Sequence, residues 1–341
     1  MGTELNLFNN EEMVDILEFI EDIKKSDKVT IVTHGGIMHA DDVMSVALIE
    51  AFFIVYGNKE MKFEVIRCER TRKIEDIENK QFVVDVGNCD EFDGKTLYLD
   101  HHQTDSGVYP ENGIKLAACG KVFDILFNKS AKFNDAVLEY VRTKLLYPIE
   151  AADNGQELDV LEHKLAWVKN FNPAFEEENY DSDKMFGICV TITKQILARV
   201  FREAVAHGNA LKVFTDALYT SRTNPDFRNV LFFEKAIPWQ DFYFNNRDLC
   251  ELIRYIVFED TLSKEGYVLR TIPKEPNSFE IKFPLPSKWE GLRGEELSKV
   301  SGIDGAIFCH KTGFMAKWDT FEHVMQAVNA AIGDLAMMPV E

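Results

Sequence analysis

Carboxylate and imidazole side chains recur in the first half of the sequence at places where short apolar runs end. The run VTIVTH ends at His34, FVVDVG carries Asp85, and TLYLDHH ends in an Asp-His-His tripeptide. His39 and Asp41 follow in the loop after the first run, and Asp153 stands where a further apolar stretch meets an Asp-Asn-Gly turn. Half of the eight histidines of the chain fall in this set.

This combination of ligand types is typical of an open divalent-metal site. Hard carboxylates and imidazoles without thiolates suit Mn²⁺, Mg²⁺, Co²⁺ or Zn²⁺ rather than a closed structural zinc site. Two ions about 3.5–4 Å apart could share one carboxylate and activate a bridging water for attack on a phosphoryl group. The six cysteines form no Cys-x-x-Cys pair, so we expect reduced thiols rather than ligands.

Each residue also has a structural interpretation when it is taken alone. A buried aspartate at the end of a strand often caps the following helix, which is an equal alternative for Asp85. Asp41 and Asp42 could serve only as favourable charges at a helix N-terminus. An ordinary surface or core role is expected for three further histidines, His163, His207 and His323. The metal interpretation therefore depends on the whole set meeting in one place.

Strands and helices alternate in the part of the chain that must position these residues. Apolar periodicity predicts an amphipathic helix over residues 11–25, and a second helix begins at the pair Asp41 and Asp42 and ends at Gly57. Strands are predicted at residues 29–33, 63–67, 82–86 and 96–99, which indicates a parallel α/β sheet. Because ligands gather at the carboxyl ends of the strands of such sheets, we expect the candidate side chains at one rim.

The second half of the chain shows a different pattern. After a helix near residues 118–128 the chain is predicted to be mostly helical to about residue 220, with a polar, solvated loop at 171–183. Short strands and a closing helix are then predicted at 230–234, 255–259, 267–272, 306–309 and 320–337. We expect two domains: a parallel-sheet α/β domain over residues 1–220 and a smaller α+β domain over residues 228–341.

At these residues the sequence resembles the DHH phosphoesterase superfamily, which is named for the tripeptide found here at Asp100, His101 and His102. Within it the closer likeness is to the melanocyte-proliferating-gene family of metal-dependent exonucleases. The motifs of the first half are THGGIMHADD from residue 33, RTR at 70–72, VVDVG at 83–87, DHHQ at 100–103 and DNG at 153–155. Further on, PKEPNSF, LPSKWEGLRGEEL, VSGIDGAIFCH and KTGF extend the likeness over nearly the whole chain.

The resemblance implies a dinuclear centre in which Asp85 bridges two ions. The ligands of one ion would be His34, His39 and Asp85, and those of the other Asp41, Asp85, His101 and Asp153. His102 would face the substrate phosphate or orient the attacking water. Asp100 would accept a hydrogen bond from a ligating imidazole and so fix its tautomer.

The resemblance also implies phosphate contacts from the second domain, by Arg293 and His310, with Lys274 as a weaker candidate. Three positions depart from the family pattern. Asp42 stands where glutamate is usual, and it is either a ligand of shorter reach or, as we expect, a residue behind the ligands. Thr104 replaces a basic residue, and His39 replaces an aspartate of the wider superfamily, which makes the first site more tolerant of zinc or cobalt.

The activity implied by the resemblance is 3′-to-5′ exonucleolytic trimming of single-stranded RNA with two divalent ions, Mn²⁺ before Mg²⁺, Co²⁺ or Zn²⁺. The net charge of −19 opposes non-specific nucleic-acid binding, although residues 261–318 carry nine Lys and Arg against seven Asp and Glu. No stripe of aromatic residues alternates with basic ones. A core role is expected for the three aromatic residues of this segment that could stack on bases, Phe283, Trp289 and Phe314.

Two other functions stay open on the sequence. One is hydrolysis of small phosphates such as pyrophosphate, dinucleotides or nucleotide bisphosphates, and the other is a metal-binding regulator without activity. The longest apolar runs are too short to cross a bilayer, and the acidic start resembles neither a signal peptide nor a mitochondrial presequence. We therefore expect no membrane partner and a cytosolic location, with the nucleus as the alternative.

Overall fold

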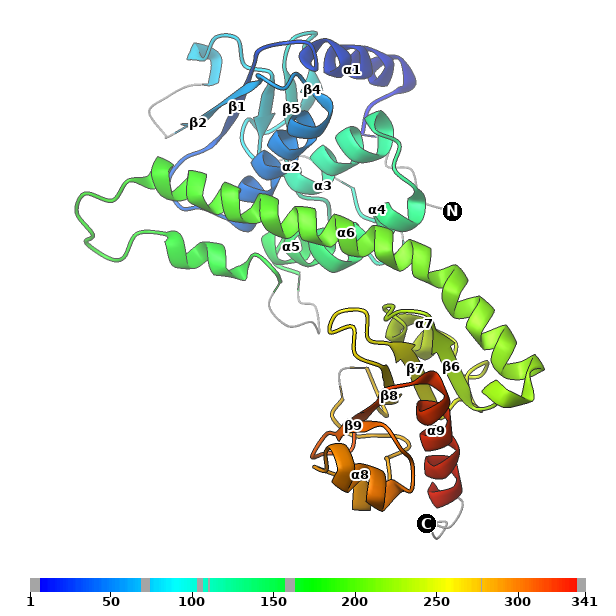
Figure 1. The fold of residues 1–341 in the computed structure, drawn as a ribbon. Helices are drawn as coiled ribbons and strands as arrows, with labels where there is room; N and C mark the ends of the chain where they lie inside the picture. The colour runs from blue at the N-terminus through cyan, green and yellow to red at the C-terminus, as the bar shows by residue number, and fades with distance from the viewer. Residues whose placement is uncertain are drawn as a thin grey trace. The chain divides into compact units, whose positions relative to one another are not determined.

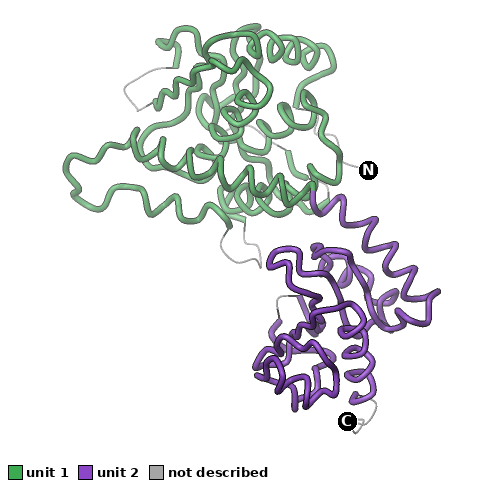
Figure 2. The backbone as a smooth tube through the Cα atoms, in the orientation of Figure 1, with its two compact units in different colours: residues 1–205 green, residues 206–341 purple. Residues whose placement is uncertain are grey.

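The computed structural model describes residues 7–68, 74–102, 107–109, 111–156, 163–276 and 278–335. The chain divides into two compact units, Met1–Val205 and Ala206–Glu341 (Figure 2). The division falls inside the long helix α6 (Ser182–Thr223), and each unit has a five-stranded sheet and an apolar core of its own. The expected α/β fold class is thereby confirmed. A catalytic role for residues 1–220 and a substrate-binding role for residues 228–341 stay predictions.

The sheet of the first unit has the strand order β2-β1-β3-β5-β4. Its members are β1 (Lys28–His34), β2 (Lys62–Cys68), β3 (Phe82–Val84), β4 (Asp90–Phe92) and β5 (Leu97–Leu99). Strands β2, β1, β3 and β5 are parallel as predicted, whereas β4 pairs with β5 in the antiparallel direction at the edge. Strand β4 was not predicted, because it spans three residues, Asp-Glu-Phe, without an apolar alternation.

Among the described residues, the shorter α-helices that accompany this sheet are α1 (Asn10–Ile23), α2 (Ala40–Tyr56), α3 (Ala118–Phe123), α4 (Asp135–Val141) and α5 (Tyr147–Asp153). In α1 the residues Ile16, Ile20 and Ile23 face the core, as the helical spacing predicted. Helix α2 packs against β1 and β3 (Figure 1). Because its sequence is apolar on almost every side, it is buried along most of its length. The predicted helix at 118–128 widens into π-helical turns after Phe123.

The helix α3 can lie close to α5 only because residue 120 is a glycine. A Cβ atom at Gly120 would come within 1.9 Å of Glu150 Oε1. Glu150 is fully buried, and its Oε1 accepts a hydrogen bond from the backbone N–H of Ala117 at 3.1 Å. This contact fixes the beginning of α3, which lies beside the candidate metal ligands described below.

The sheet of the second unit has the strand order β6-β7-β8-β10-β9. Its members are β6 (Val230–Phe233), β7 (Tyr255–Glu259), β8 (Tyr267–Thr271), β9 (Ala306–Cys309) and β10 (Met315–Trp318), and its helices are α7 (Gln240–Asn245), α8 (Gly294–Ser301) and α9 (Phe321–Leu335). Only β6 and β7 are parallel in this sheet. Strand β10 was not predicted, because it contains Lys317, whose buried ammonium group lies 2.8 Å from Asp260 Oδ2.

No helix among the described residues is long and apolar enough to cross a bilayer. The motif residues 70–72 and 103, together with Thr104, lie outside the described residues.

Candidate metal centre

The candidate ligands of the first half meet at the carboxyl-terminal rim of the first sheet. His34 is the last residue of β1, Asp85 follows β3, and the Asp-His-His tripeptide follows β5. These three strands are parallel neighbours, so the residues after them are brought to the same edge. Their ligand atoms form three groups within 4.8 Å: His34, His39 and Asp85; Asp41, His101 and Asp153; and Asp85, Asp100, His101 and His102.

Asp85 lies between two imidazoles. Its Oδ2 is 3.3 Å from His34 Nε2, and its Oδ1 is 3.4 Å from His101 Nε2. The residue is buried and has a φ of 55°, in the left-handed region where side chains other than glycine are strained. Burial opposes its ionisation, but His101 and His34 outweigh burial and lower the pKa of Asp85 to about 2. The Asp85 carboxylate therefore faces two imidazoles at once, one through each oxygen.

The loop after β1 orients His34 and His39. His34 Nδ1 lies 3.0 Å from the Gly35 carbonyl oxygen, which fixes the tautomer and leaves Nε2 directed at Asp85 and Asp42. Asp42 is fully buried, with Oδ2 3.1 Å from His34 Nε2 and Oδ1 accepting the His39 N–H at 3.0 Å. Burial works against a charged imidazole, yet Asp42 and Asp85 raise the pKa of His34 to about 11.

The second group joins helices α2 and α5 to the tripeptide. His101 Nε2 lies 2.9 Å from Asp153 Oδ2 and 3.8 Å from Asp41 Oδ2. Asp41 accepts hydrogen bonds from the first N–H groups of α3, those of Ala118 at 3.0 Å and Cys119 at 2.8 Å. Burial and the neighbouring Asp85 and Asp153 nevertheless raise the pKa of Asp41 well above its usual value. Such a site favours a bound cation.

Asp100 differs in one respect from its expected role. Its side chain was expected to bond the imidazole of a metal ligand such as His101. Instead, Oδ1 lies 2.8 Å from Nδ1 of His102, the residue expected to face the phosphate. Oδ2 accepts the Asn88 N–H at 2.6 Å, and Oδ1 also accepts the His101 N–H at 2.7 Å. Asp100 therefore orients His102 and holds the backbone of the tripeptide, and His102 is left half exposed.

Unpaired buried atoms test whether these residues fit divalent ions. His34 Nε2, His101 Nε2, both carboxylate oxygens of Asp85 and Asp42 Oδ2 are all buried, and their contacts of 2.9–3.4 Å within the cluster do not meet the geometry of hydrogen bonds. Polar atoms are rarely left in this state inside a protein without a ligand or an ion. Other buried atoms in this state are scattered over the described residues, whereas these five lie together and are imidazole nitrogens or carboxylate oxygens. The donor set fits one or two hard or borderline divalent cations.

Sequence comparison places the chain in a family. The model of the family described as "Uncharacterised protein family (UPF0160)", MYG1 exonuclease, matches residues 30–332. The chain belongs to the MYG1 exonuclease family. The match includes every residue discussed above as a candidate ligand and also the candidate phosphate contacts of the second unit.

Individual relatives in this family share about a quarter of their residues with the chain. A MYG1 protein of Chlamydia trachomatis is 27% identical over 305 residues, which cover 88% of this chain and 95% of the relative. The MYG1 exonuclease of Homo sapiens is 25% identical over 337 residues, which cover 90% and 86%. Among solved structures, RecJ of Thermus thermophilus in complex with Mg²⁺ matches with a TM-score of 0.27 and 12% identity. The match covers 99% of this chain and 54% of the RecJ chain, and a likeness this low does not establish a shared fold.

The candidate phosphate contacts of this MYG1 family member lie in the second unit. Arg293 is exposed at the start of α8, with its guanidinium 5.4 Å from the centre of the Phe308 ring. His310 Nδ1 lies 2.9 Å from Thr312 Oγ1, and its ring lies 4.4 Å from that of Phe314. Lys274 forms an exposed ion pair with Glu280 at 3.0 Å. Arg293 and His310 keep polar atoms accessible, whereas Lys274 has a carboxylate partner.

The second unit also pairs aromatic rings with arginines that are far apart in the sequence. Arg254 lies 4.2 Å from the centre of the Phe283 ring, and Arg270 lies 4.9 Å from that of Phe314. Both rings are half-buried, whereas Trp289 is 1% exposed and belongs to the core, as expected. Sequence inspection missed these pairs because each joins two distant segments.

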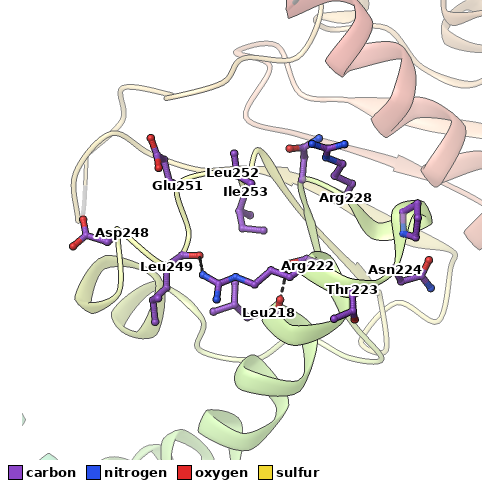
Figure 3. A pocket seen from close by; sticks show the side chains of 13 residues that line it. Leu218, Arg222, Thr223, Asn224, Arg228, Asp248, Leu249, Glu251, Leu252 and Ile253 are labelled. Carbon is purple, nitrogen blue, oxygen red and sulfur yellow. Dashed lines mark hydrogen bonds between the residues drawn. The ribbon is translucent and has the colours of Figure 1, made fainter.

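A cavity of about 390 Å³ lies within the second unit between the end of α6 and the segment after α7 (Figure 3). Arg222 and Arg228 line it together with Asp248 and Glu251, so its charges are mixed. The Arg222 guanidinium already donates to the Leu249 carbonyl oxygen at 2.7 Å. No predicted site residue lines this cavity, and we assign it no part in the metal centre.

Several residues that support the centre were not identified from the sequence. Lys121 is fully buried and donates to Asp90 Oδ2 at 2.5 Å and to the Asp100 carbonyl oxygen at 2.7 Å, which anchors the tripeptide. Arg67 and Asn172 hold the loop after β1, as described below. Arg67 in the Arg-Cys pair that ends β2, and the asparagine of FNPAF, are polar residues beside apolar ones in the sequence. Their role could not be predicted, because it depends on contacts with a distant segment of the chain.

Proposed function

We propose that the chain is a metal-dependent phosphodiester hydrolase that removes nucleotides from the 3′ end of single-stranded RNA. The observation that carries this proposal is Asp85, whose two buried oxygens face two separate imidazole-carboxylate groups. The relatives named MYG1 exonuclease in Homo sapiens and Mus musculus support a nucleic-acid substrate. A cytosolic location stays a prediction.

Two divalent ions, Mn²⁺ in our proposal, would supply Lewis-acid activation of water and neutralise the phosphoryl oxygens. His34, His39 and Asp85 would hold one, and Asp41, Asp85, His101 and Asp153 the other. Asp42 is kept outside the ligand set in this scheme, because its Oδ1 accepts the His39 and Val43 N–H groups at 3.0 Å and 2.6 Å. Its Oδ2 lies 3.1 Å from His34 Nε2 and would orient that imidazole. The mixed imidazole and carboxylate set also admits Mg²⁺, Co²⁺ or Zn²⁺.

His102 is the proton-carrying residue of the proposal. Its Nδ1 is held by Asp100 Oδ1, so Nε2 is free to face a phosphate oxygen or an attacking water. The side chain is 49% exposed, unlike His101 at 7%, which suits contact with a substrate. We propose that His102 orients the water and protonates the leaving oxygen.

Space for a substrate lies directly beside the ligands. A cavity of about 340 Å³ is lined by His39 and Asp153 together with Lys169, His163 and an apolar wall that includes Val168. An apolar wall next to metal ligands suits a nucleoside whose phosphate is held at the metal centre. From the second unit, Arg293 and His310 are proposed to contact phosphate, with Lys274 as the weaker candidate.

The proposal is tested with metal-stripped protein to which Mn²⁺, Mg²⁺, Co²⁺ or Zn²⁺ is returned. The substrates are pyrophosphate, a dinucleotide, and RNA and DNA strands labelled at either end. Metal-dependent, stepwise shortening of 5′-labelled RNA, with loss of a 3′ label in the first step, supports a 3′-to-5′ exonuclease. Turnover restricted to pyrophosphate and the dinucleotide would reject the RNA assignment in favour of hydrolysis of small phosphates. Metal binding without turnover of any substrate would favour a metal-binding regulator without activity.

A further inference from the structure

The loop that carries His39 has little support of its own. It connects β1 to α2 through Gly35, Gly36, Ile37 and Met38, and Gly36 has a φ of 80° with open space around it. Glycines give such a loop many alternative conformations when it is not tied down. The side chain of Ile37 is 62% exposed and contributes little packing. Within α2, Asp42 Oδ1 accepts the His39 N–H at 3.0 Å. The preceding turn through Gly36 and Met38 is the part of the loop that needs contacts from elsewhere in the chain.

Asn172 makes one of these contacts, although it lies 134 residues from the loop. Its Oδ1 accepts the Met38 N–H at 2.7 Å, and its Nδ2 donates to the Met38 carbonyl oxygen at 2.9 Å. The amide thus satisfies both backbone groups of Met38, as a neighbouring strand would. The side chain of Met38 is itself 2% exposed, so this point of the loop is held on its backbone and on its side chain.

Arg67, at the end of β2, makes a second contact with the same loop. Its guanidinium donates to the Gly36 carbonyl oxygen at 3.0 Å and to the hydroxyl of Ser182 at the start of α6. The arginine side chain is 3% exposed and lies over the Phe186 ring at 4.6 Å. Arg67 therefore ties the loop to α6, while Asn172 ties it to the segment that leads into α6.

We propose that Asn172 is a positioning residue for His39, with Arg67 fixing the preceding turn. The inference rests on the proposed metal centre and deepens it. It concerns the group His34, His39 and Asp85 only. In the other group, Asp41 and Asp153 are carried by helices, and Asp41 is also held by two N–H groups of α3, so that group has support that does not come from the loop. The segment 171–183 was predicted to be a solvated loop. Through Asn172 it instead helps to hold the loop that carries His39.

The experiment measures Co²⁺ binding to the metal-stripped, full-length chain by visible absorption and by titration calorimetry. Variants His34→Ala and Asp153→Ala identify the binding step that belongs to each group. The test variants are Asn172→Ala and Asn172→Asp, because aspartate keeps the shape of asparagine but replaces its donor by an acceptor. Asn246→Ala is the matched control, since Asn246 also donates to a backbone carbonyl oxygen, that of Phe242 at 2.9 Å.

We expect both Asn172 variants to weaken the step assigned to His34 by about 10- to 100-fold, the range found for residues that orient metal ligands. The absorption bands of that Co²⁺ ion should change, and the step assigned to Asp153 should stay unchanged. Retention of the His34 step in Asn172→Asp would overturn the inference, because packing alone would then explain the residue. Equal weakening of both steps, or an effect of the same size in Asn246→Ala, would also overturn it.

Metal binding is read without any nuclease substrate, so the inference and the proposed activity can fail separately. Two Co²⁺ steps with an Asn172 effect, but no hydrolysis of RNA, would keep the positioning role and reject the exonuclease. Absence of any Co²⁺ binding by the unchanged chain would reject both the metal centre and the role of Asn172.

Discussion

Asp85→Asn is the substitution that separates the metal centre from the fold. Asparagine has nearly the shape of aspartate and tolerates the left-handed φ of 55° at this position, so the backbone is kept. It removes the charge that faces both His34 and His101. Any change in metal response then reflects the lost carboxylate rather than a broken turn.

The magnitude follows from linkage between binding and unfolding. At an Mn²⁺ concentration of about 100 Kd, a single ion stabilises the folded unit by ~2.7 kcal/mol. For a unit of residues 1–205, this corresponds to a rise in Tm of about 5–10 °C. A loss of affinity of about 100-fold leaves Mn²⁺ near its new Kd and a stabilisation of ~0.4 kcal/mol, or about 1–2 °C.

The assay is thermal unfolding of metal-stripped protein with increasing Mn²⁺, followed by circular dichroism. Each variant is compared with its own metal-free Tm, so a change in intrinsic stability does not enter. Asp216→Asn is the matched control, because Asp216 forms an exposed pair with Lys212 at 2.6 Å, outside the unit that carries the candidate ligands, and it should keep the full rise. A rise in Asp85→Asn as large as that of the unchanged chain would refute the assignment of Asp85.

Three further outcomes are expected. Burial raises the pKa of Glu150 to about 8, above the 4.5 of an unperturbed group. Between these two pH values the folded state binds more protons than the unfolded state. The free energy of unfolding should therefore fall as pH rises from 4.5 through 8. Glu150→Gln should make that slope less steep in urea titrations of metal-stripped protein, with the clearest change below pH 6.5, where the raised pKa of His34 does not yet contribute; an unchanged slope would contradict the raised pKa of Glu150. Lys121→Met leaves Asp90 without its buried partner and should destabilise the chain by about 3 kcal/mol in the same titrations, with recovery in Lys121→Met/Asp90→Asn; no recovery would argue against the pair. Arg293→Ala should raise KM for RNA while bound metal, measured by elemental analysis, stays constant; loss of metal would contradict a phosphate-binding role.

The sequence predicted a candidate metal site and determined most of the strands. The order of acid and imidazole residues after β1, β3 and β5 was enough to expect one rim, because parallel strands place their carboxyl ends together. Strands β7 and β9 were predicted with the bounds that the structure gives. These elements have strong apolar patterns, so local periodicity alone specifies them.

Short or charged elements could not be predicted in this way. Strand β4 is three residues long, and β10 contains Lys317, which is tolerated only because Asp260 and Ser263 meet its ammonium group. A buried lysine breaks the apolar pattern on which a sequence-based prediction depends. Its partners lie more than 50 residues away, in a separate loop.

The tertiary structure alone decided how each candidate residue is held. The sequence offered Asp100 as a partner for a ligating imidazole, whereas the fold places its carboxylate on His102. It gave no reason to single out Asn172, whose two hydrogen bonds to Met38 exist only after the segment before α6 has returned to the first sheet. Ligand identity depends on side-chain chemistry, which can be read along the chain. Ligand position depends on contacts between distant segments, which form only when the core brings them together.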